Sequence, residues 1–137
     1  MKKIITSLLF IMTTFLFAGC SDSTSNESIG IKDTNGDYSK LNIALISDTI
    51  GTEQFILQAY EALEKASNTY GFKMTSIECT DTAAWEENTL AASNEGYDLI
   101  IGIGWQAADP FSDAADKFPN TKYAVIDTTA ANQKVTS

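Results

Sequence analysis

The chain has 137 residues, 44% of them hydrophobic, and carries 18 acidic against 9 basic side chains, for a formal net charge of −9 at pH 7. Such an acidic surface repels nucleic acid and anionic lipid headgroups, which excludes DNA, RNA and peripheral lipid as ligands. The chain contains no histidine, and this excludes a Cys/His nucleophile and a zinc site.

The N-terminal residues have the pattern of an exported, lipid-anchored chain. Lys2 and Lys3 precede an apolar run over residues 4–18, which is shorter than the ~20 residues that cross a bilayer as a helix. Residues 16–20, Leu-Phe-Ala-Gly-Cys, resemble a bacterial lipobox, in which a lipid is joined to the cysteine thiol before cleavage. We therefore expect a signal peptide over residues 1–19, a palmitate-type lipid anchor on Cys20, and a location on the extracytoplasmic face of the cell membrane. A buried or disulfide-bonded Cys20 is the alternative, which the polar residues after it disfavour.

The segment that follows is rich in Ser, Thr, Asn, Asp and Gly, and with Cys20 it predicts a flexible linker over residues 20–40. Removal of the signal peptide takes away Lys2 and Lys3, so 18 acidic residues then stand against 7 of the 9 basic ones. Cys79 becomes the one thiol beside the lipidated cysteine, and no internal disulfide is expected.

From residue 41 onward, short apolar runs alternate with helical patterns. Strands are expected at 41–47, 72–79, 97–104 and 121–127, and helices at 53–70, about 83–95 and 109–118. Gly71 is expected to end the first helix, and Asp109 and Pro110 to be the N-cap and first residue of the last one. The alternation predicts an α/β fold, an open parallel sheet of βαβ units with helices on both faces.

The last residues, 130–137, are polar and irregular where a further helix is expected. We therefore expect residues 41–137 to be a partial lobe, truncated after its fourth strand and left with unpaired backbone groups at that edge.

Candidate binding residues follow the strands, because an open parallel sheet binds ligands beyond the carboxyl ends of its strands. Asp48, Trp105 and Asp127 follow the first, third and fourth strands and are expected on a common rim. The two carboxylates can accept hydrogen bonds from the vicinal hydroxyls of a sugar-like ligand, although an aspartate after a strand more often caps the next helix or turn. Phe55, in the first helix, either stacks on a planar base or packs in the core.

The glycines at the third strand suggest an alternative function. Gly102-x-Gly104-x-x-Ala107 follows a strand and opens toward a helix, with Asp127 further on, which resembles a dinucleotide fingerprint. That fingerprint belongs to the first βα unit of a Rossmann domain, whereas this one is in the third, and a close strand-to-helix turn also requires glycine. No activated nucleophile accompanies it, so we expect no catalytic residue, no cofactor and no metal; a nucleotide-using α/β enzyme is the alternative.

Two longer segments resemble a known family. IALISDTIGTEQFILQAYEALEKA (43–66) and GYDLIIGIGWQAADPFSDAADKFPNTKYAVID (96–127) are similar to the basic membrane protein family of bacterial lipoproteins, the purine-nucleoside receptors of ABC transporters. The pairing of the GYDLII strand with the FPNxKYAxID strand carries this resemblance.

The resemblance implies a periplasmic-binding-protein-like type I lobe, a nucleoside ligand and an ABC permease partner. It matches Asp48 to the family's acidic residue after the first strand, Phe55 to its base-stacking aromatic, and Asp127 to its acidic residue on the ribose side. The sequence departs from the family at Gly51 and Ile56, where polar residues are usual.

The family clasps its ligand between two lobes, so we expect this chain alone to bind nucleoside weakly or not at all. A gene fragment without function, or a partial domain with a separately encoded remainder, is the other alternative.

Overall fold

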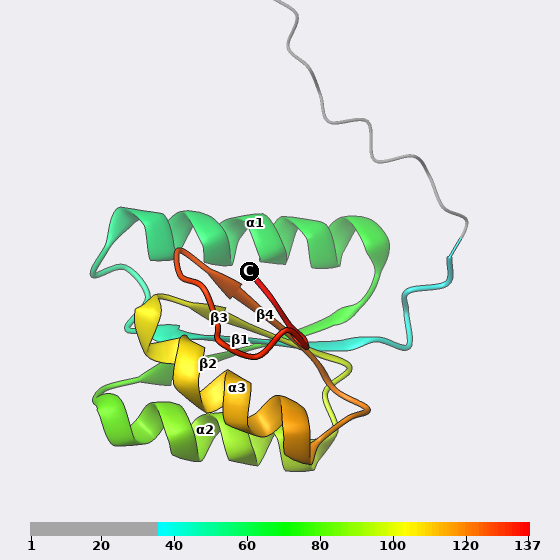
Figure 1. The fold of residues 1–137 in the computed structure, drawn as a ribbon. Coiled ribbons are helices and arrows are strands. Elements are labelled where there is room, and N and C mark those ends of the chain that lie inside the picture. The colour runs from blue at the N-terminus through cyan, green and yellow to red at the C-terminus, as the bar shows by residue number, and fades with distance from the viewer. Residues whose placement is uncertain (1–35) are drawn as a thin grey trace, which may run out of the picture. The chain divides into compact units, whose positions relative to one another are not determined.

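Parallel strands pair into one sheet with the order β2-β1-β3-β4-β5 in the computed structural model, which describes residues 36–137 (Figure 1). The strands are β1 (Asn42–Asp48), β2 (Lys73–Cys79), β3 (Leu99–Ile103), β4 (Lys122–Ile126) and β5 (Val135–Thr136). The helices are α1 (Gln54–Tyr70), α2 (Thr82–Glu95), the 3-10 turn η1 (Trp105–Ala107) and α3 (Ala108–Lys117). The predicted α/β class is confirmed. The expected signal peptide, the lipidated Cys20 and the linker up to residue 35 lie outside the described residues.

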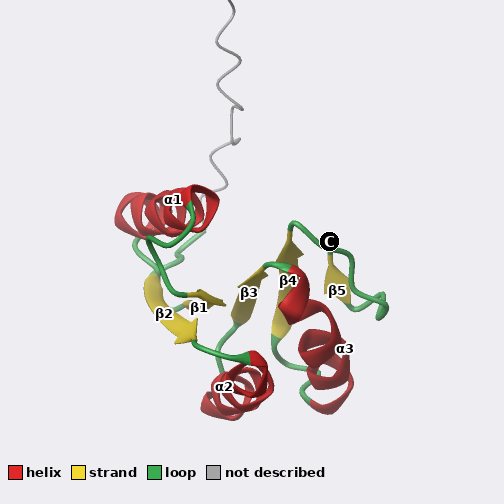
Figure 2. Cartoon of the chain, turned by 90° about the vertical axis from the view of Figure 1, so that its left-hand side faces the viewer, coloured by secondary structure: helices red, strands yellow, loops and turns green. Residues whose placement is uncertain are grey.

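The helices cover the sheet from both sides, with α1 over one face and α2 and α3 over the other (Figures 1 and 2). β1 lies between β2 and β3 and is buried from Ile43 to Ser47, which explains why residues 43–46 are all apolar. Alternate residues of β1 belong to the two hydrophobic cores, one on each face of the sheet. Ala44 and Ile46 lie in the core under α2 and α3, while Leu45 packs with Ile56 of α1.

The end of the chain differs from the prediction. Residues 135 and 136 form β5, which pairs in parallel with Tyr123 and Ala124 of β4. The expectation of an irregular tail and an unpaired edge at the fourth strand was therefore wrong for these residues, while residues 130–134 are neither helix nor strand. Asn132 secures the connection, because its side-chain Nδ2 donates to the carbonyl oxygen of Ser112 on α3 at 2.9 Å. A two-residue strand whose backbone does the pairing leaves no periodic signal in the sequence.

The start of α3 also differs. The chain passes from Gly104 directly into η1, and α3 begins at Ala108 with Ala107 as its N-cap, without a side-chain hydrogen bond. Asp109 and Pro110 therefore lie inside the first turn, and the prediction of Asp109 as the cap was wrong. Proline is tolerated there because the first N–H groups of a helix have no intrahelical partner.

The glycine explanation for the turn after β3 is supported by the packing. A Cβ on Gly102 would lie 2.5 Å from the Cβ of Ala107 and 2.8 Å from the ring of Phe111. Gly104 has a φ of 106°, a conformation that side chains disfavour. At the end of α1, Gly71 is left-handed and its N–H donates to the carbonyl oxygen of Ser67 at 2.8 Å, as expected for a helix stop.

Candidate functional site

The carboxyl ends of β1, β2, β3 and β4 meet at one edge of the sheet, because these strands are parallel neighbours. Asp48 is the last residue of β1, and Trp105 follows β3 as the first residue of η1. The N–H of Gly104 donates to the carbonyl oxygen of Ile126 at 3.0 Å, which joins the end of β3 to the end of β4. We call this edge the rim.

The carboxylate of Asp48 is held from two sides. Its Oδ1 accepts a hydrogen bond from Nε1 of Trp85 at 3.2 Å, and its Oδ2 accepts one from Nε2 of Gln106 at 3.0 Å. Trp85 is only 1% exposed, so its indole N–H needs a partner inside the protein. The hydroxyl of Ser47 donates to the backbone carbonyl oxygen of Asp48 at 2.8 Å. Each carboxylate oxygen keeps a further lone pair, so Asp48 can still accept hydrogen bonds from a ligand.

Asp48 lies at the wall of a hollow of about 410 Å³, which we call the rim hollow. Its lining residues come from the ends of β1 and β2, the start of α2, and η1: Asp48, Thr49, Thr52, Cys79, Thr80, Asp81, Thr82, Trp85, Trp105 and Gln106. The lining is rich in hydroxyl groups and contains no lysine or arginine. Trp105 contributes an indole that is 72% exposed, which provides a face for stacking. The rim hollow therefore suits a planar ligand that carries no negative charge and donates hydrogen bonds.

Asp81 has a structural role at this place. Its carboxylate caps α2 by accepting the N–H of Ala84 at 2.9 Å. Asp81 therefore has the common role of an aspartate that follows a strand, which is to cap the next helix. Asp48 has no such role, since the N-cap of α1 is Glu53, whose side chain makes no cap hydrogen bond.

The other two predicted site residues lie beyond the rim hollow. Phe55 is 38% exposed and belongs to neither core cluster, so it does not pack as a core residue. Asp127 is exposed and adopts a φ of 65°, which is uncommon outside glycine and easiest for Asp and Asn. The structure thus brings Asp48 and Trp105 together in one hollow and leaves Phe55 and Asp127 outside its lining.

Two residues of this network were not predicted as site residues. They are Trp85 of α2 and Gln106 of η1. The signal for Trp85 was available, because a buried tryptophan carries an N–H that must find an acceptor. Gln106 gives no such signal, since its contact with Asp48 spans 58 residues of sequence.

Cys79 also lines the rim hollow, but as a buried thiol that is 2% exposed. Burial raises the pKa of the Cys79 thiol, and the nearby carboxylates of Asp48 and Asp81 raise it further, against the opposing effect of a hydrogen bond from Asn88. The thiol therefore stays protonated near neutral pH and is a poor nucleophile.

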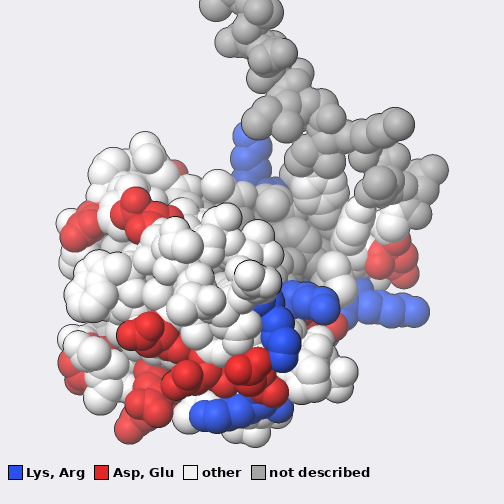
Figure 3. Space-filling view, in the orientation of Figure 1, with Lys and Arg blue, Asp and Glu red and all other residues white. Residues whose placement is uncertain are grey.

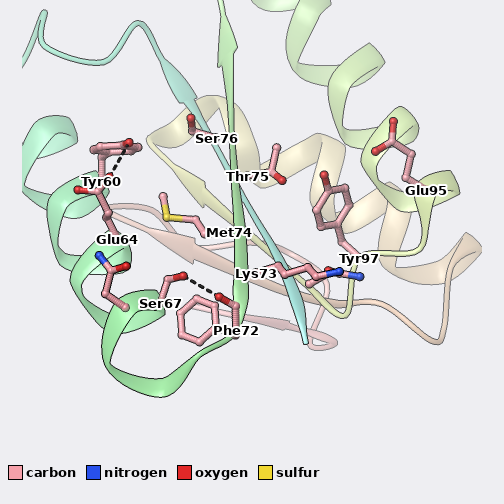
Figure 4. A pocket seen from close by; sticks show the side chains of 12 residues that line it. Tyr60, Glu64, Ser67, Phe72, Lys73, Met74, Thr75, Ser76, Glu95 and Tyr97 are labelled. Carbon is pink, nitrogen blue, oxygen red and sulfur yellow. Dashed lines mark hydrogen bonds between the residues drawn. The ribbon is translucent and has the colours of Figure 1, made fainter. Parts of the chain in front are cut away.

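A second hollow, of about 710 Å³, lies at the other end of the sheet, along the amino-terminal half of β2 (Figure 4). Two of its polar side chains donate hydrogen bonds within it: the Tyr60 hydroxyl donates to Oε1 of Glu64 at 3.2 Å, and Ser67 donates to the carbonyl oxygen of Phe72 at 2.6 Å. The Glu64 carboxylate raises the pKa of the Tyr60 phenol. This second hollow lies away from the carboxyl ends of the strands, where open parallel sheets bind their ligands. We therefore regard the rim hollow as the candidate site.

The distribution of charge and the arrangement of possible metal ligands limit the class of ligand that this chain can bind. Acidic side chains gather on the surface around α2 and α3 (Figure 3), a distribution that disfavours anionic ligands. Residues 36–137 contain no group of three or more Cys, Asp or Glu side chains placed to hold a metal ion. None of the helices in this part of the chain is long and apolar enough to cross a membrane.

Comparison with known proteins identifies related sequences. A family model described as ABC transporter substrate-binding protein PnrA-like matches residues 40–137. An ABC transporter nucleoside-binding protein, BmpA, from Lactococcus lactis is 27% identical over 142 residues, with 98% of this chain and 39% of that protein covered. An uncharacterized lipoprotein of Pyrococcus horikoshii is 31% identical over 132 residues, with 93% of this chain and 31% of that protein covered. The chain thus spans about a third of the length of these curated relatives.

Solved structures agree with this fold. A solute-binding protein of an ABC transporter system from Aeropyrum pernix superposes with a TM-score of 0.63 and 26% identity, covering 69% of this chain and 27% of that one. A lipoprotein fragment from Peptoclostridium difficile gives a TM-score of 0.59 and 27% identity, covering 72% of this chain and 84% of that fragment.

Proposed function

Because the chain belongs to the family of PnrA-like ABC transporter substrate-binding proteins, we propose that it forms part of a receptor that binds a nucleoside outside the cell membrane and performs no chemistry. The relative named as a nucleoside-binding protein supports this solute class. The observation that carries the proposal is the rim hollow, where the fixed carboxylate of Asp48 lies beside the exposed indole of Trp105.

The rim residues take complementary roles in this proposal. The Trp105 indole stacks on the nucleobase, since base–aromatic stacking is worth about 1–3 kcal/mol and needs an exposed ring. Asp48 accepts hydrogen bonds from N–H or O–H groups of the ligand. Phe55 and Asp127, outside the hollow, extend the contact surface toward the base and the ribose.

Binding by this chain alone is expected to be weak. Trp105 is 72% exposed, so a nucleoside stacked on it stays partly in water. Good small-molecule sites bury most of the ligand surface, and here one lobe supplies only one wall. We propose that the remaining wall belongs to a second lobe, as in the family, and that an ABC permease receives the solute.

The location of this receptor is also proposed. Cys20 carries the lipid that anchors the chain to the extracytoplasmic face of the cell membrane, and relatives named as lipoproteins support this. Radiolabelled palmitate is expected to enter the wild-type chain in cells and not the Cys20→Ser variant. Equal labelling of both chains would remove the anchor from the proposal.

Nucleoside binding is tested by titration with adenosine, guanosine, inosine and ribose, followed by NMR of the tryptophan indole N–H groups up to ~10 mM ligand. We expect saturable shifts of the Trp105 resonance with the nucleosides. Trp105→Ala, followed through the resonance of Trp85, which also lines the rim hollow, should weaken binding by roughly 5- to 150-fold, the equivalent of about 1–3 kcal/mol. The matched control is Tyr70→Ala, since Tyr70 is an exposed aromatic at the far end of α1. No nucleoside-dependent shift would refute the proposed function, and micromolar affinity would contradict the argument for a single wall.

A further inference from the structure

Three elements that are distant in sequence converge on the carboxylate of Asp48. Trp85 reaches it from α2 across 37 residues, and Gln106 reaches it from η1 across 58 residues. Asp48 itself ends β1. The hydrogen bonds from Trp85 and Gln106 therefore tie β1, α2 and η1 together at the wall of the rim hollow.

The position of the Gln106 side chain depends on Gly104. A Cβ on Gly104 would lie 2.7 Å from Oε1 of Gln106, so the carboxamide lies against the bare α-carbon of that glycine. Its Nε2 is directed to Asp48 at 3.0 Å. Gly104 thus makes room for the conformation in which Gln106 reaches the carboxylate.

The charge surroundings explain why such support is needed. The rim hollow has no lysine or arginine in its lining, so no cation neutralises Asp48 there. The other titratable groups nearby are Asp81, which caps α2, the buried thiol of Cys79, and Glu78, whose Oε2 accepts the N–H of Ile50 at 3.3 Å. Two neutral N–H donors, from Trp85 and Gln106, stabilise the charged carboxylate instead.

We propose that Gln106 is a positioning residue of the ligand site, which together with Trp85 fixes the Asp48 carboxylate so that its remaining lone pairs meet a ligand's N–H or O–H donors in a preset geometry. The role in ligand binding rests on the proposed function. Preorganisation of this kind raises affinity because the acceptor loses little conformational freedom on binding.

The positioning is tested first without any ligand. The chain has 2 tryptophans, so NMR of its indole N–H groups gives one resonance from Trp85 and one from Trp105. Gln106→Met removes the donor and keeps the length of the side chain. We expect the Trp85 resonance to move, because the carboxylate that accepts its N–H loses its second hydrogen-bond donor and is no longer held in place.

The Gln106→Glu variant gives a sharper readout. It places a second carboxylate beside Asp48, and the repulsion between the two charges should displace the Trp85 resonance further than Gln106→Met does. The matched controls are Gln133→Met and Gln133→Glu, because Gln133 is exposed on the β4–β5 connection. A Trp85 resonance unchanged in both Gln106 variants would overturn the proposal.

A pair of glycine variants tests the space that Gln106 needs. Gly51 and Gly104 both have positive φ, of 92° and 106°, but a Cβ on Gly51 meets no atom within 4 Å. Gly104→Ala should therefore move the Trp85 resonance, and Gly51→Ala should not. The effect of Gly104→Ala should disappear in a Gln106→Ala background; an equal effect there would contradict the contact on which the positioning depends.

Adenosine titrations of the same variants then separate the two proposals. Gln106→Met should weaken adenosine binding by roughly 2- to 12-fold, as expected when one further side chain has to be immobilised on binding. If wild type and Gln106→Met bind adenosine equally, the positioning role is refuted while the proposed function stands. If the Trp85 resonance responds as expected but no chain binds adenosine, Gln106 still positions Asp48 and the proposed function fails.

Discussion

Substitution of Gly102 by alanine tests whether the glycines after β3 serve packing or phosphate binding. The added Cβ would lie 2.5 Å from the Cβ of Ala107 and 2.8 Å from two ring atoms of Phe111. Ala107 has no rotamer that could move its Cβ away. Phe111 is fully buried and packs edge-on against Tyr123, with ring centroids 5.6 Å apart. Neither neighbour can yield without a shift of α3 relative to β3.

The magnitude follows from this crowding. Overpacking a core by one methyl group costs typically about 1–3 kcal/mol. Because three contacts under 3.0 Å arise together and one partner is fixed by the backbone, we expect Gly102→Ala to lower the free energy of unfolding by about 3 kcal/mol. That is a large part of the roughly 5–10 kcal/mol available to a small domain.

Urea unfolding followed by far-ultraviolet circular dichroism measures this loss. Ala107→Gly alone should cost about 1 kcal/mol, from the loss of a fully buried methyl group. The double variant Gly102→Ala/Ala107→Gly should lose less than the two single losses combined, because the closest contact is relieved. Additive losses, with Gly102→Ala costing under about 0.5 kcal/mol, would refute the packing explanation. Saturable binding of a dinucleotide that Gly102→Ala abolishes would favour the enzyme alternative.

Two further substitutions test the helix cap and the buried phenol. Asp81→Ala should lower the free energy of unfolding by about 1 kcal/mol, while Glu53→Ala, at an N-cap without a side-chain hydrogen bond, should change little; equal losses in urea unfolding would contradict the capping role. Burial raises the pKa of Tyr123 against the opposing effect of its hydrogen bond with Ser93, so above about pH 10 the unfolded chain releases its proton first and stability falls as pH rises. Tyr123→Phe should therefore reduce this alkaline loss, and an unchanged dependence of stability on pH would show that the phenol does not cause it.

Much of the fold could be predicted because strands and helices that are buried consist largely of apolar residues, which can be recognised in the sequence. Residues 99–104 carry no polar side chain, and β3 lies between β1 and β4 with helices on both faces. Gly71 ends α1 in the left-handed conformation, as its position predicted. β5 was not predicted because a strand of two residues shows no periodicity. The start of α3 was predicted wrongly because η1 precedes the proline that was expected to open the helix.

The site was partly predictable for a different reason. Parallel topology alone brings the ends of neighbouring strands to one edge, so Asp48 and Trp105 could be placed near each other from strand positions. The partners of Asp48 could not be found in this way. Trp85 and Gln106 reach it through side-chain hydrogen bonds, which depend on rotamers and on the packing of α2 and η1 against the sheet. The sequence pattern contains no information on those distances.

The rim combines a fixed acceptor with an open stacking surface, and the two properties should affect binding differently. Affinity grows with the ligand surface removed from water, and a single wall leaves part of the ligand exposed in this chain. Discrimination between ligands depends instead on whether their hydrogen-bond donors match an acceptor of fixed position. Asp48 is such an acceptor, because both of its carboxylate oxygens already accept hydrogen bonds from the protein. Selectivity between nucleosides should therefore persist where affinity is low.

Titrations with adenosine, inosine and guanosine would show unequal dissociation constants in the wild-type chain, and these differences should shrink when Gln106→Met frees the carboxylate. Equal constants in the wild type would mean that the held carboxylate does not face the ligand.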